Sequence, residues 1–454
     1  MSQQVGIPKG TRDFSPEVMR RRNYIFGIIR EAFEKFGFQP LETPSMENLS
    51  TLTGKYGDEG DQLIFKILNN GDFLKDVASE KLSDSRKLSF EICDRALRYD
   101  LTVPFARFVA MNRNDLSFPF RRYQIQPVWR ADRPQKGRFR EFYQCDADVV
   151  GTESLWSEIE LIQLFDQVLF KLNIPKFEIK INNRKVLFGL AEVTQCTNQF
   201  TALTVVLDKL DKIGMEAVQK ELAELGISSE VTRILTDFAT CSETESQLQF
   251  LSNELKDSET GMKGIEELTF LFENLKGRIS KAILSFDLTL ARGLNYYTGA
   301  IFEVKALDVQ MGSICGGGRY DNLTGVFGLP NVSGVGISFG ADRIYEVMNE
   351  LNLFPSGIDR GARVAIVHFG GETQFAAFNL CHELRSNEIQ AVFYPEDAKI
   401  KKQMKYAHDL GAEFVIVIGE DELVKQAWQV KNMQTGEQFE SSTQGIIQLL
   451  TGSM

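Results

Sequence analysis

The spacing of apolar residues changes several times along the chain, and each change predicts a different kind of element. Apolar residues recur at helical spacing over residues 16–36, and the pattern stops at Gly37. Over residues 120–149 apolar and polar residues alternate, which predicts two antiparallel strands joined by a loop that contains Gly137. Residues 200–278 are helical in pattern and dense in mixed charge, so we expect a separate helical segment there.

A further strand is predicted over residues 38–46, and its prolines restrict where it can lie. Pro40 and Pro44 have no backbone N–H to donate to a neighbouring strand. This strand is therefore expected at the edge of a sheet or against another subunit.

The last third of the chain returns to strands and then changes texture at a linker. Strands are expected over 300–304 and 335–339, followed by a helix over 341–351. Pro355 and Gly357 mark the linker. Beyond it, strands at 364–369, 391–394 and 414–418 alternate with helices at 372–386 and 398–410. This alternation is typical of a small α/β domain.

Length and composition narrow the class of protein. A chain of 454 residues is too long for one core and should form two or three domains. It has no run of eighteen or more apolar residues and no charged-then-apolar leader, so we expect no membrane partner and a cytoplasmic location. The six cysteines lack any C-x-x-C spacing, which argues against a disulfide framework and a zinc site.

Charge is distributed unevenly along the chain. The net charge of −11 disfavours a nucleic-acid partner for the protein as a whole, but basic residues gather locally. A second, weaker cluster holds Lys399, Lys401, Lys402 and Lys405, and it is an open question whether it contacts RNA. The main cluster, beside the single acid Asp132, consists of Arg121, Arg122, Arg130, Arg133, Lys136, Arg138 and Arg140. Planar guanidinium groups of this kind fork onto phosphate oxygens.

The three histidines, His368, His382 and His408, all lie near the C-terminus, downstream of the segments that look chemical. The chemistry is therefore expected to use no histidine base, no histidine-activated nucleophile and no histidine-ligated metal. Positioning and electrostatics remain, and nucleotidyl transfer is a reaction that runs largely on those two effects.

Five segments, in order, carry a resemblance to a known family. They are Gly37-Phe-Gln-Pro-Leu-Glu-Thr-Pro-Ser-Met46, residues Phe120 to Val149 with Trp129-Arg-Ala-Asp132 inside them, Leu290-Ala-Arg-Gly-Leu-Asn-Tyr-Tyr-Thr-Gly299, Cys315-Gly-Gly-Gly-Arg-Tyr-Asp321 and Gly334-Val-Gly-Ile-Ser-Phe-Gly-Ala-Asp-Arg343. The first, second and fifth resemble motifs 1, 2 and 3 of class II aminoacyl-tRNA synthetases. The other two resemble segments peculiar to histidyl-tRNA synthetases, except that Asn295 stands where that family commonly has aspartate.

The resemblance implies an α+β fold. We expect a class II synthetase catalytic domain, an antiparallel β-sheet flanked by helices, with a helical insertion and a C-terminal α/β anticodon-binding domain. The implied bounds are 1–199 and 279–352 for the catalytic core, 200–278 for the insertion, 353–362 for the linker and 363–454 for the anticodon-binding domain. A homodimer is also implied, with Pro44 at its interface.

The resemblance assigns roles around ATP. Arg130, Arg292 and Arg343 are implied as catalytic residues. Arg130 and Arg292 would hold the α-phosphate, Arg138 the γ-phosphate and Asp132 the adenine side. Arg343 would stack on the adenine and touch the γ-phosphate. Magnesium should accompany ATP, held by carboxylates that the sequence does not single out.

The implied histidine-binding residues are Asp100, Thr102, Arg130, Gln144, Asp148, Arg292, Tyr296 and Tyr297. Asp100 and Thr102 would take the α-amino group with Gln144, and Asp148 and Tyr297 would pair with the two ring nitrogens. An imidazole has a nitrogen on each side, so a site with a polar group on each side rejects analogues that lack them.

The activity implied is ligation of L-histidine to tRNA(His). Histidine and ATP would form histidyl-adenylate and pyrophosphate, and the histidyl group would pass to the terminal adenosine ribose. Two alternatives remain open. One is a non-catalytic synthetase-like protein, such as a regulatory subunit of a phosphoribosyltransferase or a histidine- or RNA-sensing domain. The other is a different class II synthetase, such as a prolyl or threonyl enzyme.

Overall fold

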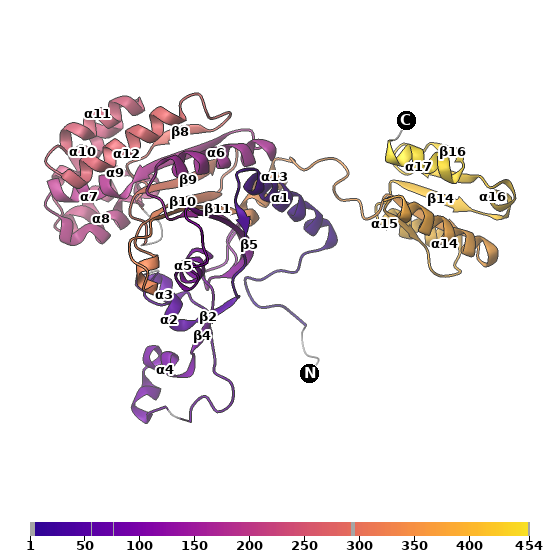
Figure 1. Ribbon diagram of the computed structural model, residues 1–454, viewed down its shortest axis with the longest axis horizontal. Coiled ribbons are helices and arrows are strands. Elements are labelled where there is room, and N and C mark those ends of the chain that lie inside the picture. The colour runs from indigo at the N-terminus through magenta and orange to yellow at the C-terminus, as the bar shows by residue number, and fades with distance from the viewer. Residues whose placement is uncertain (1–4, 56, 76, 292–295, 453–454) are drawn as a thin grey trace. The chain divides into compact units, whose positions relative to one another are not determined.

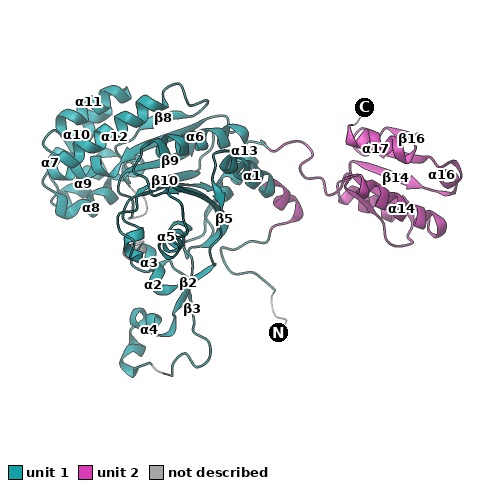
Figure 2. Cartoon of the chain, in the orientation of Figure 1, with its two compact units in different colours: residues 1–13, 22–353 teal, residues 14–21, 354–454 magenta. Residues whose placement is uncertain are grey.

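The computed structural model describes residues 5–55, 57–75, 77–291 and 296–452. The chain divides into two compact units, shown in different colours in Figure 2. Unit 1 comprises residues 1–13 and 22–353, and unit 2 comprises residues 14–21 and 354–454.

An eight-stranded sheet forms the centre of unit 1. Its order is β1 (Gln39–Pro40), β5 (Phe120–Trp129), β6 (Glu141–Val150), β11 (Gly334–Gly340), β10 (Cys315–Tyr320), β9 (Ala300–Ala306), β7 (Phe177–Asn183) and β8 (Ile283–Phe286). In this spatial order, each strand from β5 through β6, β11, β10 and β9 to β7 pairs antiparallel with the next. Strands β1 and β8 add parallel pairs at the two edges. The predicted hairpin is confirmed, because β5 and β6 pair from Phe120↔Val150 to Trp129↔Glu141.

Helices α1 (Pro16–Lys35) and α6 (Trp156–Lys171) cover the apolar face of this sheet (Figure 1). The rings of Phe33 and Phe165 lie 5.8 and 5.3 Å from the ring of Phe339 on β11. Helix α1 ends just before Gly37, whose φ of 77° is left-handed, as the sequence predicts. Alternation along the strands thus sends one set of side chains into this core and the other set to the opposite face.

A second, three-stranded sheet holds β2 (Met46–Asn48), β4 (Arg95–Leu97) and β3 (Lys66–Ile67). The prediction of one strand over 38–46 is wrong beyond its start, because only β1 joins the large sheet and Met46 opens β2. The chain leaves the sheet between the two prolines. Buried Arg98 donates to the carbonyl oxygens of Thr43 at 2.6 Å and Pro44 at 3.2 Å, which fixes the segment outside a strand ladder.

The remaining helical elements of unit 1 fall into two groups. Around the small sheet and the rim of the large one lie α2 (Leu49–Leu52), α3 (Gly57–Gln62), η1 (Ser79–Ser83), α4 (Ser85–Ile92), α5 (Thr102–Met111), η3 (Thr324–Phe327) and α13 (Ala341–Glu350). The second group contains α7 (Arg184–Val193) and η2 (Thr197–Gln199), and then, within the predicted helical segment 200–278, α8 (Phe200–Leu207), α9 (Leu210–Glu224), α10 (Ser229–Thr240), α11 (Thr244–Glu254) and α12 (Glu259–Leu275). Helices α7 and α12 touch backbone to backbone, since a Cβ on Gly189 would lie 2.4 Å from the Cα of Gly261.

Unit 2 contains a five-stranded sheet. Its order is β13 (Ala391–Phe393), β12 (Val364–His368), β14 (Phe414–Ile418), β15 (Trp428–Asn432) and β16 (Gln438–Ser441), with helices α14 (Gly371–Ser386), α15 (Ile400–Asp409), α16 (Glu420–Lys425) and α17 (Thr443–Thr451). The three strands that the sequence predicts are parallel, as expected for an α/β domain, and β15 and β16 are antiparallel additions.

His368 is a structural residue of this sheet. It is fully buried, its Nε2 lies 2.8 Å from the carbonyl oxygen of Tyr394, and its Nδ1 accepts from the backbone N–H of Gly370 at 3.1 Å. No helix within the described ranges is long and apolar enough to cross a membrane.

Candidate active site

A cavity of about 310 Å³ opens on the polar face of the large sheet in unit 1. Strands β6, β9, β10 and β11, the loop after β5, Leu290, Tyr297 and the start of α13 supply its walls. Its lining residues are Arg130, Asp132, Gly137, Arg138, Phe139, Phe142, Tyr143, Gln144, Leu290, Tyr297, Ile301, Phe302, Glu303, Ser313, Ile314, Cys315, Gly316, Gly317, Ser338, Gly340, Asp342 and Arg343.

Two glycines of β11 allow neighbouring groups to approach the sheet where a side chain would not fit. Gly336 lies opposite Asp148 in the strand register, and a Cβ there would come within 2.0 Å of the Asp148 Oδ1. A Cβ on Gly340 would lie 2.9 Å from the carbonyl oxygen of Ile314. Side chains at these two positions would displace their neighbours, so the glycines let polar groups approach the sheet closely.

Positive charge gathers at one end of the cavity. Arg343 donates from Nε to the carbonyl oxygen of Gly137 at 3.1 Å and from Nη1 to that of Ser313 at 2.5 Å. Burial lowers the pKa of Arg343, and the nearby charges of Arg138 and Arg130 lower it further. Within the described part of the chain neither Arg130 nor Arg343 forms an ion pair with a carboxylate. An anionic ligand would relieve this mutual repulsion.

Neighbouring aromatic rings hold Arg130 in place. Its Nε donates to the carbonyl oxygen of Tyr99 at 3.0 Å. Its guanidinium carbon lies 4.4 Å from the centre of the Tyr99 ring and 5.2 Å from that of Phe142. Arg138 is half exposed and lies 3.7 Å from Asp132. Arg130 is therefore fixed in the wall of the cavity, whereas Arg138 sits nearer to solvent.

The sequence suggested that the whole basic cluster faces a polyanion, and this is wrong for most of its members. Only Arg130 and Arg138, of the seven residues, line the cavity. Arg121 pairs with Glu160 at 2.6 Å, and Lys136 is similarly engaged with a surface acid. Arg122 points to the polar face but is fully buried in an ion pair. Alternation along β5 separates Arg121 from Arg122, because neighbouring residues of a strand face opposite sides of the sheet, and the other five basic residues lie beyond the end of β5.

Negative charge gathers beside the other end of the cavity. Asp148 is buried, lies 2.8 Å from the Arg122 guanidinium, and accepts from the hydroxyl of Tyr320 at 2.5 Å. Asp100 is also buried and accepts from the hydroxyl of Tyr296 at 3.1 Å. The carboxylates of Asp100 and Asp148 lie here with the guanidinium of Arg122, so acidic groups outnumber the cation next to them.

Two pKa shifts report the same electrostatic field. Burial raises the pKa of Tyr297, and Asp148, Asp146 and Asp100 raise it further. Burial also raises the pKa of Asp146 to about 7; Arg122 opposes this rise, and Asp148 adds to it. The field therefore favours a cationic group of a ligand near Tyr297.

The structure brings together six of the site residues implied by the resemblance. Lining the cavity are Arg130, Asp132, Arg138, Gln144, Tyr297 and Arg343. Four others do not line it, namely Asp100, Thr102, Asp148 and Tyr296. Asp100, Asp148 and Tyr296 lie in the polar contacts next to Tyr297, and Thr102 begins α5. Arg292 and Asn295 lie outside the described residues.

Sequence reasoning missed several polar residues around the site. Tyr320 and Arg122 hold Asp148, and Ser338 lies opposite Asp146 on β11 and accepts from the side-chain amide of Gln144 at 3.1 Å. Tyr320 belongs to the segment 315–321, so its position in a family segment was an available signal. The others needed the strand register, which the sequence does not provide.

Comparisons with known proteins give the chain its family. The family model described as "Histidyl-tRNA synthetase" matches residues 10–344, and that described as "Anticodon binding domain" matches residues 363–452. The chain belongs to the histidyl-tRNA synthetase family. The family membership and the α+β class II architecture expected from the sequence are therefore confirmed.

Relatives of this family match along the whole chain. A histidine–tRNA ligase of Christiangramia forsetii is 55% identical over 451 residues, covering 98% of this chain and 99% of that protein. A histidine–tRNA ligase of Bacteroides fragilis (strain YCH46) is 53% identical over 454 residues, covering 99% and 100%. The crystal structure of the histidyl-tRNA synthetase from Nostoc sp. PCC 7120 has a TM-score of 0.84 and 31% identity and covers 100% of both chains.

Proposed function

We propose that the cavity of unit 1 is the site at which this enzyme carries out the reaction of its family. Histidine reacts with ATP to give histidyl-adenylate and pyrophosphate, and the histidyl group then passes to the terminal adenosine ribose of tRNA(His). One observation carries the assignment of the site. Arg130 and Arg343, which form no ion pair with a carboxylate among the described residues, meet at one end of the cavity, and buried carboxylates meet beside the other end. This polarity suits a triphosphate next to an amino acid.

In the first step a carboxylate oxygen of histidine attacks the α-phosphorus of ATP, and the bond to the pyrophosphate oxygen breaks. We assign Arg130 to the α-phosphate and the histidine carboxylate. Arg343 and Arg138 take the adenine and γ-phosphate side, with Asp132 near the adenine. The resemblance implies the same α-phosphate role for Arg292, which lies outside the described residues. Fixed guanidinium groups stabilise the charge that develops on phosphate oxygens and need no proton transfer to do so.

At the other end we assign Asp100, Thr102 and Gln144 to the α-amino group and Asp148 with Tyr297 to the imidazole, with Tyr296 beside them. Support comes from burial: Gln144 keeps an Oε1 atom with no partner within the described residues, and Tyr297 lines the cavity. Arg122 and Tyr320 already engage the Asp148 carboxylate, so a ring N–H of histidine would donate to its remaining lone pairs.

We propose that Mg²⁺ enters with ATP. The described residues contain no group of three His, Cys, Asp or Glu arranged to hold a metal ion. Asp132 and Glu303 are carboxylates on the cavity wall, and one or two such groups beside phosphate oxygens are the usual setting for this ion. When bound, it would neutralise charge on the phosphates.

The enzyme's partners are tRNA, histidine and ATP, and we propose a division of labour along the chain. Residues 1–199 and 279–352 form the catalytic core, with 200–278 as an insertion, 353–362 as a linker and 363–454 as the part that binds the anticodon. The loop between β5 and β6 is the proposed contact for the acceptor end, because it borders the cavity and carries Arg138. We place the enzyme in the cytoplasm.

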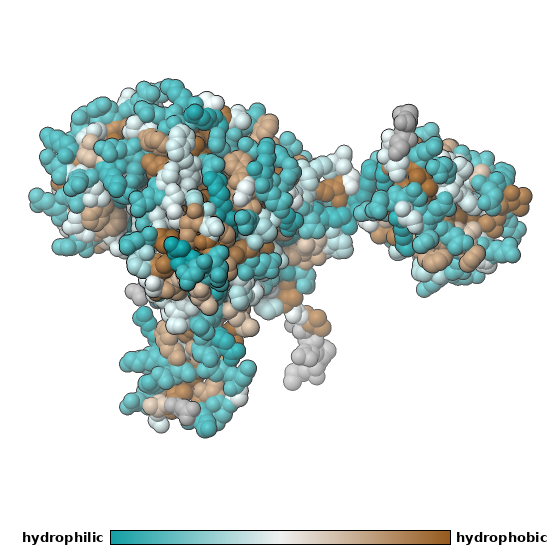
Figure 3. All heavy atoms as spheres, viewed as in Figure 1, coloured by the Kyte–Doolittle hydropathy of each residue, from teal (hydrophilic) through white to brown (hydrophobic). Residues whose placement is uncertain are grey.

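We also propose a homodimer. Both residues of β1 are exposed at the edge of the sheet, and Pro44 after it is exposed too. Neither η1 nor α4 buries a residue. On the part of unit 1 that holds these two helices, apolar side chains lie scattered among hydrophilic ones (Figure 3). The exposed ones are Leu68, Phe73, Leu74, Leu82 and Phe90. A partner subunit would cover such surfaces, and a monomer by light scattering at micromolar concentration would contradict this.

The assignment of the site is tested with a matched pair of variants in histidine-dependent ATP–pyrophosphate exchange. Arg130→Ala should lower exchange roughly 100-fold or more, because it removes a fixed cation at the reacting phosphate. Arg121→Ala, one strand further from the cavity and paired with Glu160, should retain activity within about twofold. Equal losses in the two variants would refute the proposed site.

A further inference from the structure

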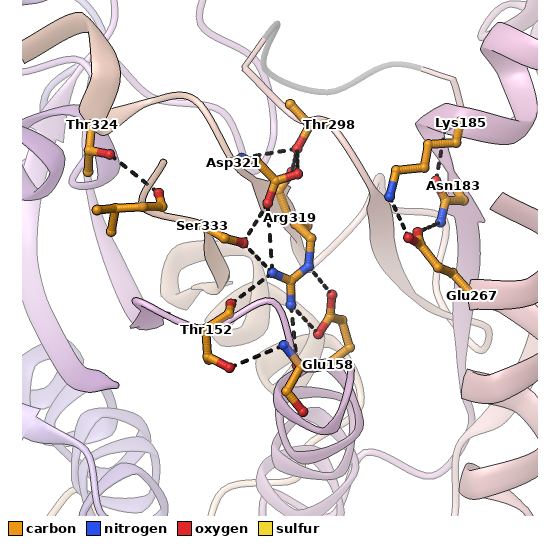
Figure 4. A network of polar contacts seen from close by, with 12 residues as sticks. Thr152, Glu158, Asn183, Lys185, Glu267, Thr298, Arg319, Asp321, Thr324 and Ser333 are labelled. Carbon is orange, nitrogen blue, oxygen red and sulfur yellow. Dashed lines mark hydrogen bonds and ion pairs between the residues drawn. The ribbon is translucent and has the colours of Figure 1, made fainter. Parts of the chain in front are cut away.

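A polar network centred on buried Arg319 of β10 includes Thr298, the residue after Tyr297 of the cavity (Figure 4). Its guanidinium donates to both carboxylate oxygens of Glu158, at 2.5 and 2.7 Å, and Glu158 is fully buried at the start of α6. It also donates to the hydroxyl of Ser333 at 2.5 Å and to the carbonyl oxygen of Thr152 at 3.1 Å. Arg319 therefore ties β10 rigidly to its surroundings.

Asp321 connects this network to Thr298. One carboxylate oxygen of Asp321 accepts from the Ser333 hydroxyl at 2.5 Å, and the other accepts from the Thr298 hydroxyl at 2.6 Å. The same Thr298 hydroxyl accepts from the backbone N–H of Asp321 at 3.0 Å. The backbone N–H of Thr298 donates to the carbonyl oxygen of Arg319 at 2.8 Å. With a weaker contact from its hydroxyl to the carbonyl oxygen of Arg319 at 3.4 Å, Thr298 is thus held by four hydrogen bonds to residues 319 and 321.

The residue before Thr298 is Tyr297, which lines the cavity. Its ring lies against the backbone of β10, since a Cβ on Gly318 would come within 2.9 Å of it. The Tyr297 ring is therefore located by two contacts with one strand, a glycine beneath the ring and the hydrogen-bonded threonine next in sequence. Fixing a backbone at one residue limits the reach of the neighbouring side chain to a small region.

We propose that Thr298 and Asp321 are positioning residues for the amino acid: together they set Tyr297 at the histidine end of the cavity. This rests on the proposed function, because Tyr297 is assigned there to the imidazole. Neither residue touches the cavity itself. We call Thr298 and Asp321 with their hydrogen bonds the clamp. A displacement of about 1 Å in a positioning group costs up to roughly 100-fold in rate, so a fixed position for Tyr297 matters.

The clamp predicts a defect in histidine use and none in ATP use. Arg319 is a poor target, because its loss leaves Glu158 buried without a cation and the variant would fail to fold. Thr298 offers a cleaner test. Thr298→Val keeps the shape of the side chain and removes the hydroxyl, while Thr298→Ser keeps the hydroxyl and removes a methyl group. Thr269→Val is the matched control, since among the described residues its hydroxyl bonds only to the carbonyl oxygen of Ile265 within α12.

KM for histidine and KM for ATP would be measured by pyrophosphate exchange, with thermal unfolding recorded alongside. Thr298→Val and Asp321→Asn should raise KM for histidine roughly tenfold at unchanged KM for ATP, and Thr298→Ser and Thr269→Val should match the unaltered enzyme. In a Tyr297→Phe background the effect of Thr298→Val should shrink, because no tyrosine hydroxyl remains to be placed.

Two results would overturn the clamp: an unchanged KM for histidine in Thr298→Val, or parallel rises in both KM values with a matching loss of stability. The clamp and the proposed function fail differently. Absence of histidine-dependent exchange in the unaltered enzyme would refute the function, whereas normal exchange with an indifferent Thr298→Val refutes only the clamp.

Discussion

Asp146 gives a sharp test of the electrostatics at the histidine end. It is buried on the polar face of β6 between Gln144 and Asp148, and its Oδ1 has no hydrogen-bond partner among the described residues. The charged and titratable groups near it include Arg122 on β5, Asp148 on its own strand, Asp100 before α5, Arg98 and Tyr297. Burial raises its pKa from the ordinary 3.8 to about 7.

This shift makes stability depend on pH in a definite direction. The folded protein holds the Asp146 proton up to about pH 7, while the unfolded chain loses it near pH 3.8, so the folded state binds more protons between these values. The contribution of Asp146 to the free energy of unfolding should therefore fall as pH rises from 4 to 7 and level off above pH 7. At ~1.4 kcal/mol per pH unit, the plateau corresponds to ~4 kcal/mol.

Asp146→Asn removes the titration and keeps the size of the side chain. The variant should equal the unaltered protein below about pH 4 and exceed it in unfolding free energy by increasing amounts up to pH 7, reaching ~4 kcal/mol. Urea unfolding followed by tryptophan fluorescence in a Trp428→Phe background would measure this, because Trp129 and Trp156 then report on unit 1 alone.

Asp308→Asn, at an exposed carboxylate, is the control and should produce no growing difference. A constant difference between Asp146→Asn and the unaltered protein from pH 4 to pH 8 would refute the reasoning, and so would a variant that becomes less stable as pH rises.

Three further changes have defined outcomes. Arg122→Met should destabilise unit 1 by about 3–5 kcal/mol in urea unfolding, because it leaves Asp148 buried without its cation, and an unchanged midpoint would contradict this. Gly336→Ala should fold but lose most histidine-dependent exchange, because its Cβ would fall 2.0 Å from the Asp148 Oδ1; full activity would show that Asp148 can move freely. Arg12→Met should raise KM for ATP roughly tenfold and leave KM for histidine unchanged. The reason is that the Arg12 guanidinium lies 3.2 Å from the centre of the Phe139 ring on the cavity wall and so holds that ring in place. Equal effects on the two KM values would argue against a role of Arg12 in positioning ATP.

Periodicity predicted much of the fold because the relevant patterns are local. The alternation over 120–149 gave β5 and β6 nearly to the residue, and the helical spacing over 16–36 gave α1. The strand over 38–46 failed for a reason that lies elsewhere in the chain, since buried Arg98 binds the carbonyl groups between the prolines. A contact across 50 or more residues leaves no trace in a local pattern.

The site residues also divide into those that a local pattern predicts and those that depend on contacts between distant parts of the chain. The residues Arg130, Gln144, Tyr297 and Arg343 were accessible through family segments and do line one cavity. The ion pair of Arg122 with Asp148 was not accessible, because it depends on the register that sets these residues opposite each other in β5 and β6. Arginines that look equivalent in sequence were separated by strand alternation into buried, surface and cavity positions.

The central claim is that the cavity in unit 1 activates histidine. The most direct measurement is ATP–pyrophosphate exchange by the purified full-length protein with each of the twenty amino acids in turn. We expect exchange with histidine alone, and its loss in Arg130→Ala. Exchange with a different amino acid, or histidine-dependent exchange that survives in Arg130→Ala, would contradict it.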